Sequence, residues 1–170
     1  MELTLPLLVR GKVREVYEVS STAALVVTSD RLSAFDVVLP EPIPGKGEVL
    51  TRLTDFWLDR LSAATPHHRL SSDPVVVRQA LVLAGLSGDD ATQAAASGRV
   101  QLVRRLEMLP VECVVRGYLT GGGWKEYQQT GRVSGLELST GLTNASRLEA
   151  PLFTPSSKAT SGHDEPIAWD

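Results

Sequence analysis

Two apolar segments separated by a short polar turn place the strongest constraint on the fold of this 170-residue chain. The segment GKVREVYEV, residues 11–19, alternates apolar and polar positions imperfectly, and ALVVTSD, residues 24–30, follows after Ser20, Ser21 and Thr22. Alternating segments joined by turn-like residues are typical of a β-hairpin. The sequence therefore predicts that the chain opens an antiparallel sheet.

A helix is the clearest element after this hairpin. Over residues 49–61 the apolar side chains recur at spacings of three and four, which is the pattern of an amphipathic helix. We expect this apolar face to pack on the sheet; its members are Val49, Leu50, Leu53, Phe56, Trp57 and Leu61.

The remaining segments give weaker patterns. Residues 36–39, 100–107 and 111–119 each predict a strand, the last of them buried, and residues 124–130 predict a short helix that ends at Gly131. Residues 74–85 could form a strand followed by a short helix, which periodicity leaves open, and residues 87–98 could form either a surface helix that begins near Asp89 or a loose insertion. Residues 134–164 predict a long irregular stretch rich in Ser, Thr and Pro.

Composition excludes several classes of protein. A hydrophobic share of 42% with 22% charged residues is ordinary for a globular chain that buries a core. The net charge of −3 argues against a nucleic-acid partner, and no apolar run reaches the length of a membrane span. Cys113 is the only cysteine, so no intrachain disulfide can form. We therefore expect a cytoplasmic protein, and a local basic pocket for a phosphorylated small molecule stays compatible with this composition.

The segment VECVVRGYLTGGGW, residues 111–124, has the features of a binding site. The predicted strand carries Glu112 and ends at Arg116, and both charges are costly to bury without partners. Gly121, Gly122 and Gly123 follow, and glycines let the backbone approach a ligand closely. Arginine suits phosphate or carboxylate because its planar fork donates in pairs. Glu112 has an alternative, purely structural role as the ion-pair partner of a basic residue.

Three other polar clusters could contribute to a site. RGKVRE, residues 10–15, is a basic loop that could cover the phosphates of a nucleotide or be a surface turn. SDRLSAFD, residues 29–36, could bind a ligand or provide an Asp–Arg ion pair and a helix cap. FTPSSKATSGHDE, residues 153–165, places Lys158 near His163, Asp164 and Glu165 and could equally be a solvated loop.

The order of these segments resembles one enzyme family. GKVRE, SDRLSAFD, EMLPVECVVRGYLTGGGWKEY, PLFTPSSKA and GHDE look like the successive signatures of the SAICAR synthetase (phosphoribosylaminoimidazole-succinocarboxamide synthase) family. The resemblance covers most of residues 10–165 and is weakest over residues 62–98. It implies an ATP- and Mg²⁺-dependent ligase of purine biosynthesis. Such a ligase joins L-aspartate to carboxyaminoimidazole ribonucleotide through an acyl phosphate.

The resemblance also implies an α+β fold with a kinase-like or ATP-grasp-like N-terminal lobe built on an antiparallel sheet. Residues 1–106 would form this nucleotide-covering lobe and residues 107–110 the linker. Residues 111–170 would begin a second, substrate-binding lobe. Members of this family often form homo-oligomers, so a monomer and a homo-oligomer both remain open.

The resemblance also implies roles for individual residues of this chain. Gly11, Lys12, Val13 and Arg14 would lie in the loop over ATP, and the backbone of Glu107 and Met108 would meet the adenine edge. Arg116 would bind the ribonucleotide 5′-phosphate beside Gly121 and Gly122, with Glu112 nearby. Ser33 and Asp36 would lie near the imidazole. Lys12, Lys158 and Asp164 would act at the reacting groups, and no metal ligand is assigned.

The chain departs from the family pattern in two ways. The family commonly has Gly-Ser-Gly where this chain has Gly121-Gly122-Gly123, so a serine hydroxyl at the phosphate is replaced by hydrogen. Family members also continue well beyond residue 170 with an acidic, metal-binding segment, so we expect a truncated chain. A non-catalytic nucleotide-binding fragment is therefore the alternative to the ligase. A kinase-like phosphotransferase is disfavoured, because neither an HRD-like loop nor a DFG-like motif occurs.

Overall fold

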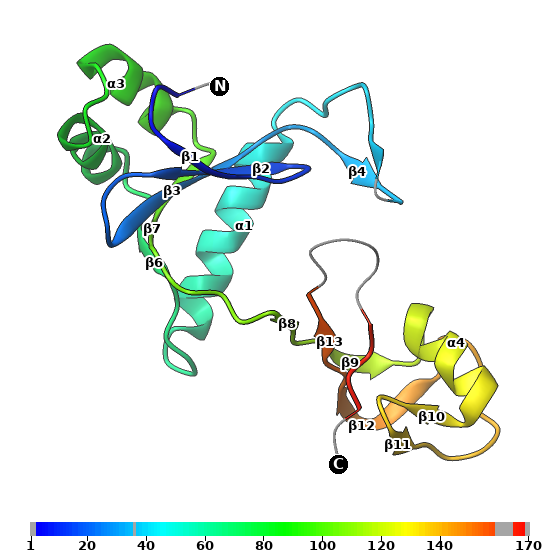
Figure 1. The fold of residues 1–170 in the computed structure, drawn as a ribbon. Coiled ribbons are helices and arrows are strands. Elements are labelled where there is room, and N and C mark those ends of the chain that lie inside the picture. Colours follow the sequence, from blue (N-terminus) through cyan, green and yellow to red (C-terminus); the bar gives the residue numbers. More distant parts are fainter. Residues whose placement is uncertain (1–2, 36, 159–164, 169–170) are drawn as a thin grey trace. The chain divides into compact units, whose positions relative to one another are not determined.

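The computed structural model describes residues 3–35, 37–158 and 165–168, and the chain separates into two compact units, Met1–Glu107 and Met108–Asp170 (Figure 1). Each unit contains helices and antiparallel strand pairs. The expected α+β fold with an antiparallel sheet is confirmed.

The first unit is built on a five-stranded sheet in the order β1-β2-β3-β7-β6. The predicted hairpin is confirmed, because β2 (Arg14–Glu18) pairs antiparallel with β3 (Ala23–Thr28). The sheet is completed by β1 (Leu7–Arg10), β6 (Arg69–Ser71) and β7 (Val100–Arg104). The short strands β4 (Ser33–Ala34) and β5 (Val37–Val38) pair only with each other.

Both segments that periodicity left open are helices, α2 (Pro74–Leu83) and α3 (Gly88–Ala96). Their starts are fixed by side-chain caps: the Asp73 carboxylate accepts hydrogen bonds from the backbone N–H groups of Val75 and Val76, and the Ser87 hydroxyl accepts one from Asp90 N–H. Capping satisfies backbone donors that the first turn of a helix leaves unpaired.

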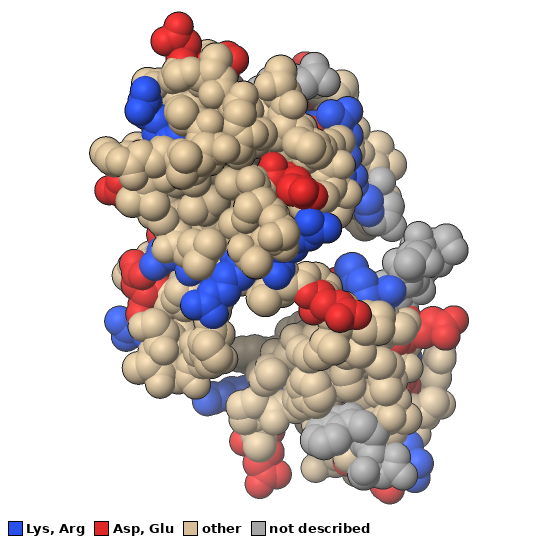
Figure 2. Space-filling view, turned by 60° about the vertical axis from the view of Figure 1, so that its left-hand side comes forward, with Lys and Arg blue, Asp and Glu red and all other residues tan. Residues whose placement is uncertain are grey.

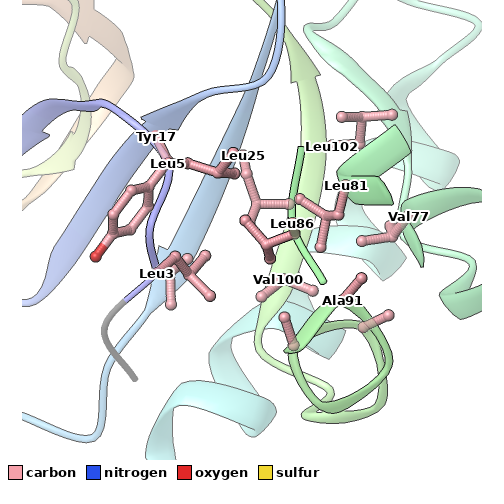
Figure 3. Close-up of a cluster of buried hydrophobic side chains, with 13 residues drawn as sticks. Leu3, Leu5, Tyr17, Leu25, Val77, Leu81, Leu86, Ala91, Val100 and Leu102 are labelled. Atoms are coloured by element: carbon pink, nitrogen blue, oxygen red, sulfur yellow. The ribbon is translucent and has the colours of Figure 1, made fainter. Parts of the chain in front are cut away.

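The core of the first unit lies between the sheet and these two helices, as Figure 3 shows. Leu25 of the sheet, Val77 and Leu81 of α2 and Ala91 of α3 are all fully buried. No side chain of the long helix described next belongs to this cluster. The sheet is therefore held on one side by α2 and α3 through apolar contacts.

The predicted long helix is present as α1 (Lys46–Leu61), but the expected orientation of its apolar face is wrong. Its buried residues are Gly47 and Thr51. A Cβ atom on Gly47 would lie 2.5 Å from the Thr28 carbonyl oxygen, so the helix approaches β3 with its backbone. The apolar face predicted to pack on the sheet is instead exposed at Val49, Leu53, Phe56, Trp57 and Leu61.

The described residues of the second unit form three antiparallel strand pairs and one helix. The pairs are β8 (Val111–Glu112) with β13 (Ser156–Ser157), β9 (Val115–Tyr118) with β12 (Arg147–Phe153), and β10 (Arg132–Val133) with β11 (Leu136–Glu137). The continuous, buried strand expected over residues 111–119 is wrong: it is divided in two, and Val115 is 65% exposed. The irregular stretch expected over residues 134–164 is wrong too, because it contains β12.

Helix α4 (Gly121–Thr130) begins at the glycine run, three residues earlier than predicted, and ends at Gly131 as expected. Gly131 has φ 70°, a left-handed conformation that glycine adopts without a Cβ clash. The small core of this unit consists of Leu119, Val133 and Leu148, with Trp124 and Tyr127 of α4 packed against it. This core fixes α4 at the end of β9.

Candidate functional site

The loop between β1 and β2 is a compact turn tied to the end of β3. Gly11 N–H donates to the Arg14 carbonyl at 2.8 Å, and a Cβ on Gly11 would lie 3.2 Å from that oxygen. The Val13 carbonyl accepts hydrogen bonds from the backbone and hydroxyl of Ser29, at 2.9 and 2.8 Å. The side chains of Lys12 and Arg14 are exposed. The loop is therefore held through its backbone, with its cations on the surface.

A carboxylate that the sequence analysis did not single out supports this loop. Glu15, whose side chain is 12% exposed, accepts a 2.8 Å hydrogen bond from the Tyr17 hydroxyl and forms ion pairs of 3.4 Å with Arg10 and Arg31. Arg31 also donates to the Gly11 carbonyl at 3.4 Å. Alternation along β2 places Glu15 and Tyr17 on one face, which is the signal that could have identified the pair.

The segment SDRLSAFD is only partly free for a ligand. Asp30 accepts a hydrogen bond from Gly47 N–H at 2.8 Å and pairs with Arg99 at 3.1 Å, so it holds the first turn of α1. The hydrogen bond from Gly47 lowers the pKa of the Asp30 carboxyl, burial opposes the shift, and Arg99 adds to it. Ser33 lies in β4 and is half-buried, and Asp36 lies outside the described residues.

Glu107 and Met108 are exposed residues outside any helix or strand, and Met108 is 81% exposed. Among the described residues, none hydrogen-bonds to the backbone of either one. Their main-chain groups are therefore available to a ligand.

Arg116 lines a pocket of the second unit with a volume of about 180 Å³. Gly122, Gly123, Glu126 and Ser134 also line this pocket, which we call the Arg116 pocket. Arg116 is half-buried, and its Nε atom is buried with no hydrogen-bond partner among the described residues. A buried N–H of a guanidinium without an acceptor is costly, so this arrangement favours a bound anion.

The glycines leave room beside this arginine. A Cβ on Gly123 would lie 3.4 Å from Cδ and Nε of Arg116, whereas a Cβ on Gly122 would meet nothing within 4 Å. Thr120 gives no side-chain cap to α4, so the first-turn N–H groups of the helix lack that partner. Arg116 and the start of α4 thus offer a cation and first-turn backbone donors without a side-chain cap in one place.

Glu126 and Ser134 of this pocket were not predicted. The Glu126 carboxylate accepts a 2.9 Å hydrogen bond from the Ser134 N–H, and Ser134 is buried with φ 50°. Glu126 follows Gly122 by four residues, so helical spacing places both on one face and could have identified Glu126. No sequence signal pointed to Ser134.

Lys158 and Glu112 form an ion pair where β13 meets β8, and Lys158 N–H donates to the Pro110 carbonyl at 2.8 Å. The structure thus brings together two predicted site residues, in the pairing that was the structural alternative for Glu112. The third predicted residue of this region, Asp164, lies outside the described residues.

Some charged side chains elsewhere form ion pairs, among them Arg52 with Glu48 and Arg105 with Glu18. Figure 2 shows a face on which Lys and Arg lie beside Asp and Glu. Among the described residues no group of three or more His, Cys, Asp and Glu side chains could hold a metal ion. Over the same residues, no helix combines the length and apolar character needed to cross a membrane.

An antiparallel α+β fold with a basic glycine loop in one unit and an arginine–glycine pocket in the other defines a class of candidate nucleotide-binding enzymes. Residues 7–170 match the family described as SAICAR synthetase. The phosphoribosylaminoimidazole-succinocarboxamide synthase of Leptothrix cholodnii is 53% identical over 98% of this chain and 52% of its own length, and that of Methylococcus capsulatus is 52% identical over 98% and 54%. The chain belongs to the SAICAR synthetase family.

A solved structure supports the same conclusion. The SAICAR synthase from Saccharomyces cerevisiae complexed with SAICAR superposes with a TM-score of 0.79 at 38% identity, over 96% of this chain and 53% of that one. The chain therefore spans about half the length of the relatives that it matches.

Proposed function

We propose that this chain carries the ATP-covering loop and the ribonucleotide phosphate site of an ATP-dependent ligase, which joins L-aspartate to carboxyaminoimidazole ribonucleotide. The observation that carries the proposal is the buried, unpartnered Nε of Arg116 in a glycine-lined pocket. Membership of the SAICAR synthetase family supports a ribonucleotide phosphate as the ligand of this candidate anion site. The yeast relative, whose structure contains SAICAR, supports a ribonucleotide of this kind.

At the Arg116 pocket, the guanidinium would donate to the 5′-phosphate while the N–H groups of Gly122 and Gly123 approach it from the start of α4. Charge-assisted hydrogen bonds of this type are roughly twice as strong as neutral ones. Glu126 lines the same pocket, and Ser134 N–H occupies one oxygen of its carboxylate. Gly121, the residue before Gly122, likewise has no side chain that could block the phosphate.

In the first unit, Gly11, Lys12, Val13 and Arg14 would cover the ATP phosphates. A loop held by its backbone keeps its donors in place, which lowers the ordering cost of binding. The unpaired main-chain groups of Glu107 and Met108 would hydrogen-bond the adenine edge.

The reaction itself needs activation of a carboxylate, because its oxygen is a poor leaving group. The carboxylate attacks the γ-phosphate of ATP, so that ADP leaves and an acyl phosphate forms. The aspartate amine then attacks the acyl carbon and phosphate leaves. The contribution of the protein is positioning and neutralisation of phosphate charge. We assign Lys12, Lys158 and Asp164 to the reacting groups, Ser33 and Asp36 to the imidazole, and Glu112 to substrate binding near Arg116.

Mg²⁺ belongs to this proposal as the ion that accompanies the triphosphate. The described residues offer no cluster that fits it, and no side chain of this chain is assigned to it. We place the protein in the cytoplasm as an enzyme of purine biosynthesis, either as a monomer or as a homo-oligomer.

The test is to incubate the chain with ATP, Mg²⁺, the carboxylated ribonucleotide and L-aspartate, and to follow ADP and the amide product. Formation of both, with loss of the amide when aspartate is omitted, is the expected result. Binding of ATP and ribonucleotide without turnover would favour the alternative, a non-catalytic nucleotide-binding part of such an enzyme. That alternative is favoured by one observation: the chain spans about half of its relatives' length.

A further inference from the structure

Helix α1 exposes a continuous apolar stripe. Val49, Leu53, Trp57 and Leu61 follow one another at a spacing of four, Phe56 lies three residues after Leu53, and the exposed fractions of all five lie between 47% and 57%. Thr51, which is buried, is two residues from both Val49 and Leu53, and two residues correspond to about 200° around a helix. The stripe therefore points away from the side of the helix that meets the sheet.

The orientation of α1 is fixed, so the helix cannot roll to bury this stripe. Gly47 packs its backbone against β3, where a Cβ would clash with the Thr28 carbonyl. On the same helix, Asp55 accepts hydrogen bonds from Arg69 at 2.9 Å and Gln101 at 2.7 Å, two residues of the sheet. These contacts would all be broken by rotation. The packing of the first unit therefore keeps the stripe exposed.

The stripe has the composition of an interaction surface. Phe56 and Trp57 meet edge to face, with ring centroids 5.2 Å apart, so the two largest side chains are already ordered by each other. Contiguous apolar patches of this kind mark contact sites, and aromatic residues are enriched in them.

We infer that the α1 stripe is the docking surface for an apolar segment from the part of the SAICAR synthetase polypeptide that lies outside the match to this chain. The relatives have nearly as much sequence outside the match as within it, since the match covers 52% and 54% of two of them. That sequence must bury apolar faces of its own, and elements of one protein bury such faces against each other. The inference concerns packing and is independent of the proposed catalysis.

A second copy of this chain fits the stripe less well. Five half-exposed side chains offer on the order of 400 Å², whereas a stable interface needs about 800 Å² from each partner. A separate copy also loses translational and rotational freedom on association, a cost that a segment of the same polypeptide avoids.

Hydroxyl-radical footprinting tests this inference. We compare the 170-residue chain with a hybrid in which it replaces the matched part of the Leptothrix cholodnii relative. Oxidation of Phe56 and Trp57 should fall at least fivefold in the hybrid, while that of Leu83, which is 89% exposed on α2, should not change. Equal oxidation of the two aromatic residues in both proteins would overturn the inference. So would protection in the chain alone that increases with concentration, because it would identify a second copy as the occupant.

Variants of the chain alone keep the inference testable if the hybrid does not fold. Because the stripe is exposed, Phe56→Ser with Trp57→Ser should leave the urea midpoint of unfolding unchanged, whereas Leu81→Ser should lower it strongly. A loss of stability from the stripe variant comparable to that of Leu81→Ser would mean that the stripe is already buried within the chain, and would overturn the inference.

Discussion

At the scale of single residues, the Asp55 carboxylate of the first unit accepts hydrogen bonds from three side chains. Burial acts to raise the pKa of its carboxyl, but hydrogen bonds from Arg69, Ser72 and Gln101 outweigh it and hold the pKa below its ordinary value. These donors come from β6, from the residue after it and from β7. The carboxylate therefore joins α1 to the edge of the sheet, and its ionisation is linked to folding.

The pH dependence of stability follows from this shift. A folded-state pKa below the unfolded value means that the unfolded chain binds the proton more readily. The contribution of Asp55 to the free energy of unfolding is complete above about pH 4, the unfolded pKa, and is lost as the pH falls through the folded pKa. We expect Asp55→Asn to cost about 1–3 kcal/mol at pH 7 and less at pH 3. Urea unfolding at both pH values measures this, and a cost that does not change with pH would contradict it.

A second residue-scale prediction concerns Gly122, where a serine hydroxyl of the family pattern is absent. A Cβ at this position meets nothing within 4 Å, so Gly122→Ser should fit without strain. One added hydrogen bond of about 0.5–1.5 kcal/mol should strengthen binding of the ribonucleotide roughly two- to tenfold. Isothermal titration calorimetry measures the change. Gly123→Ala is the control, because its Cβ would make an ordinary contact with Arg116 at 3.4 Å and adds no hydroxyl, so tighter binding by that variant would contradict the role of the added hydrogen bond.

The sequence predicted which residues lie near Arg116, but it did not predict ion pairs between residues far apart in the sequence. Arg116 and the glycines were predicted to lie together, and Arg116 and two of the glycines line one pocket. The alternative role of SDRLSAFD, an Asp–Arg ion pair with a helix cap, is the one that Asp30 fills, but its partner Arg99 is 69 residues away in the sequence. Pairing over such a separation depends on strand order, which the local pattern does not contain.

At the scale of elements, the close contact between α1 and β3 depends on the absence of a side chain at Gly47. A methyl group there would lie 2.5 Å from the Thr28 carbonyl, and backbone cannot move as a flexible side chain does. We expect Gly47→Ala to lower the free energy of unfolding by about 1–3 kcal/mol, the usual cost of overpacking. Chemical denaturation provides the value.

The matched control for this change is Gly88→Ala in α3, whose Cβ would be 3.7 Å from an Arg78 nitrogen. Alanine is the better helix former, so this variant should be neutral or slightly stabilising. Equal destabilisation by both variants would mean that the approach of α1 to β3 is not what makes Gly47 necessary.

Helix α1 also shows what hydrophobic periodicity does and does not predict. The spacing predicted the helix correctly, yet the face that packs on the sheet contains Gly47 and Thr51. A glycine that permits backbone approach adds nothing to a hydrophobic pattern, so the pattern assigned the wrong face to the sheet. For α2 and α3 the decisive signals were Asp73 and Ser87 as caps, which apolar periodicity does not include.

At the scale of the whole molecule, the chain contains two compact units, and the candidate residues are divided between them. The loop over residues 11–14 belongs to the first unit and the Arg116 pocket to the second. The assignment of residues 1–106 to a nucleotide-covering lobe and of residues 111–170 to a substrate lobe stays a prediction. Under the proposed function the two sites would serve one ligase, which needs both a triphosphate and a phosphorylated acid.

The most direct test of this account is the binding of each ligand to Arg116→Ala, measured by calorimetry on the 170-residue chain. Loss of charge-assisted hydrogen bonds should weaken the carboxylated ribonucleotide at least tenfold and leave the Kd for ATP within about twofold. Arg132→Ala, an exposed arginine of the same unit whose carboxylate partner is 3.8 Å away, should change neither. Equal losses for ribonucleotide and ATP, or no loss for the ribonucleotide, would contradict the assignment of Arg116 and with it the proposed phosphate site.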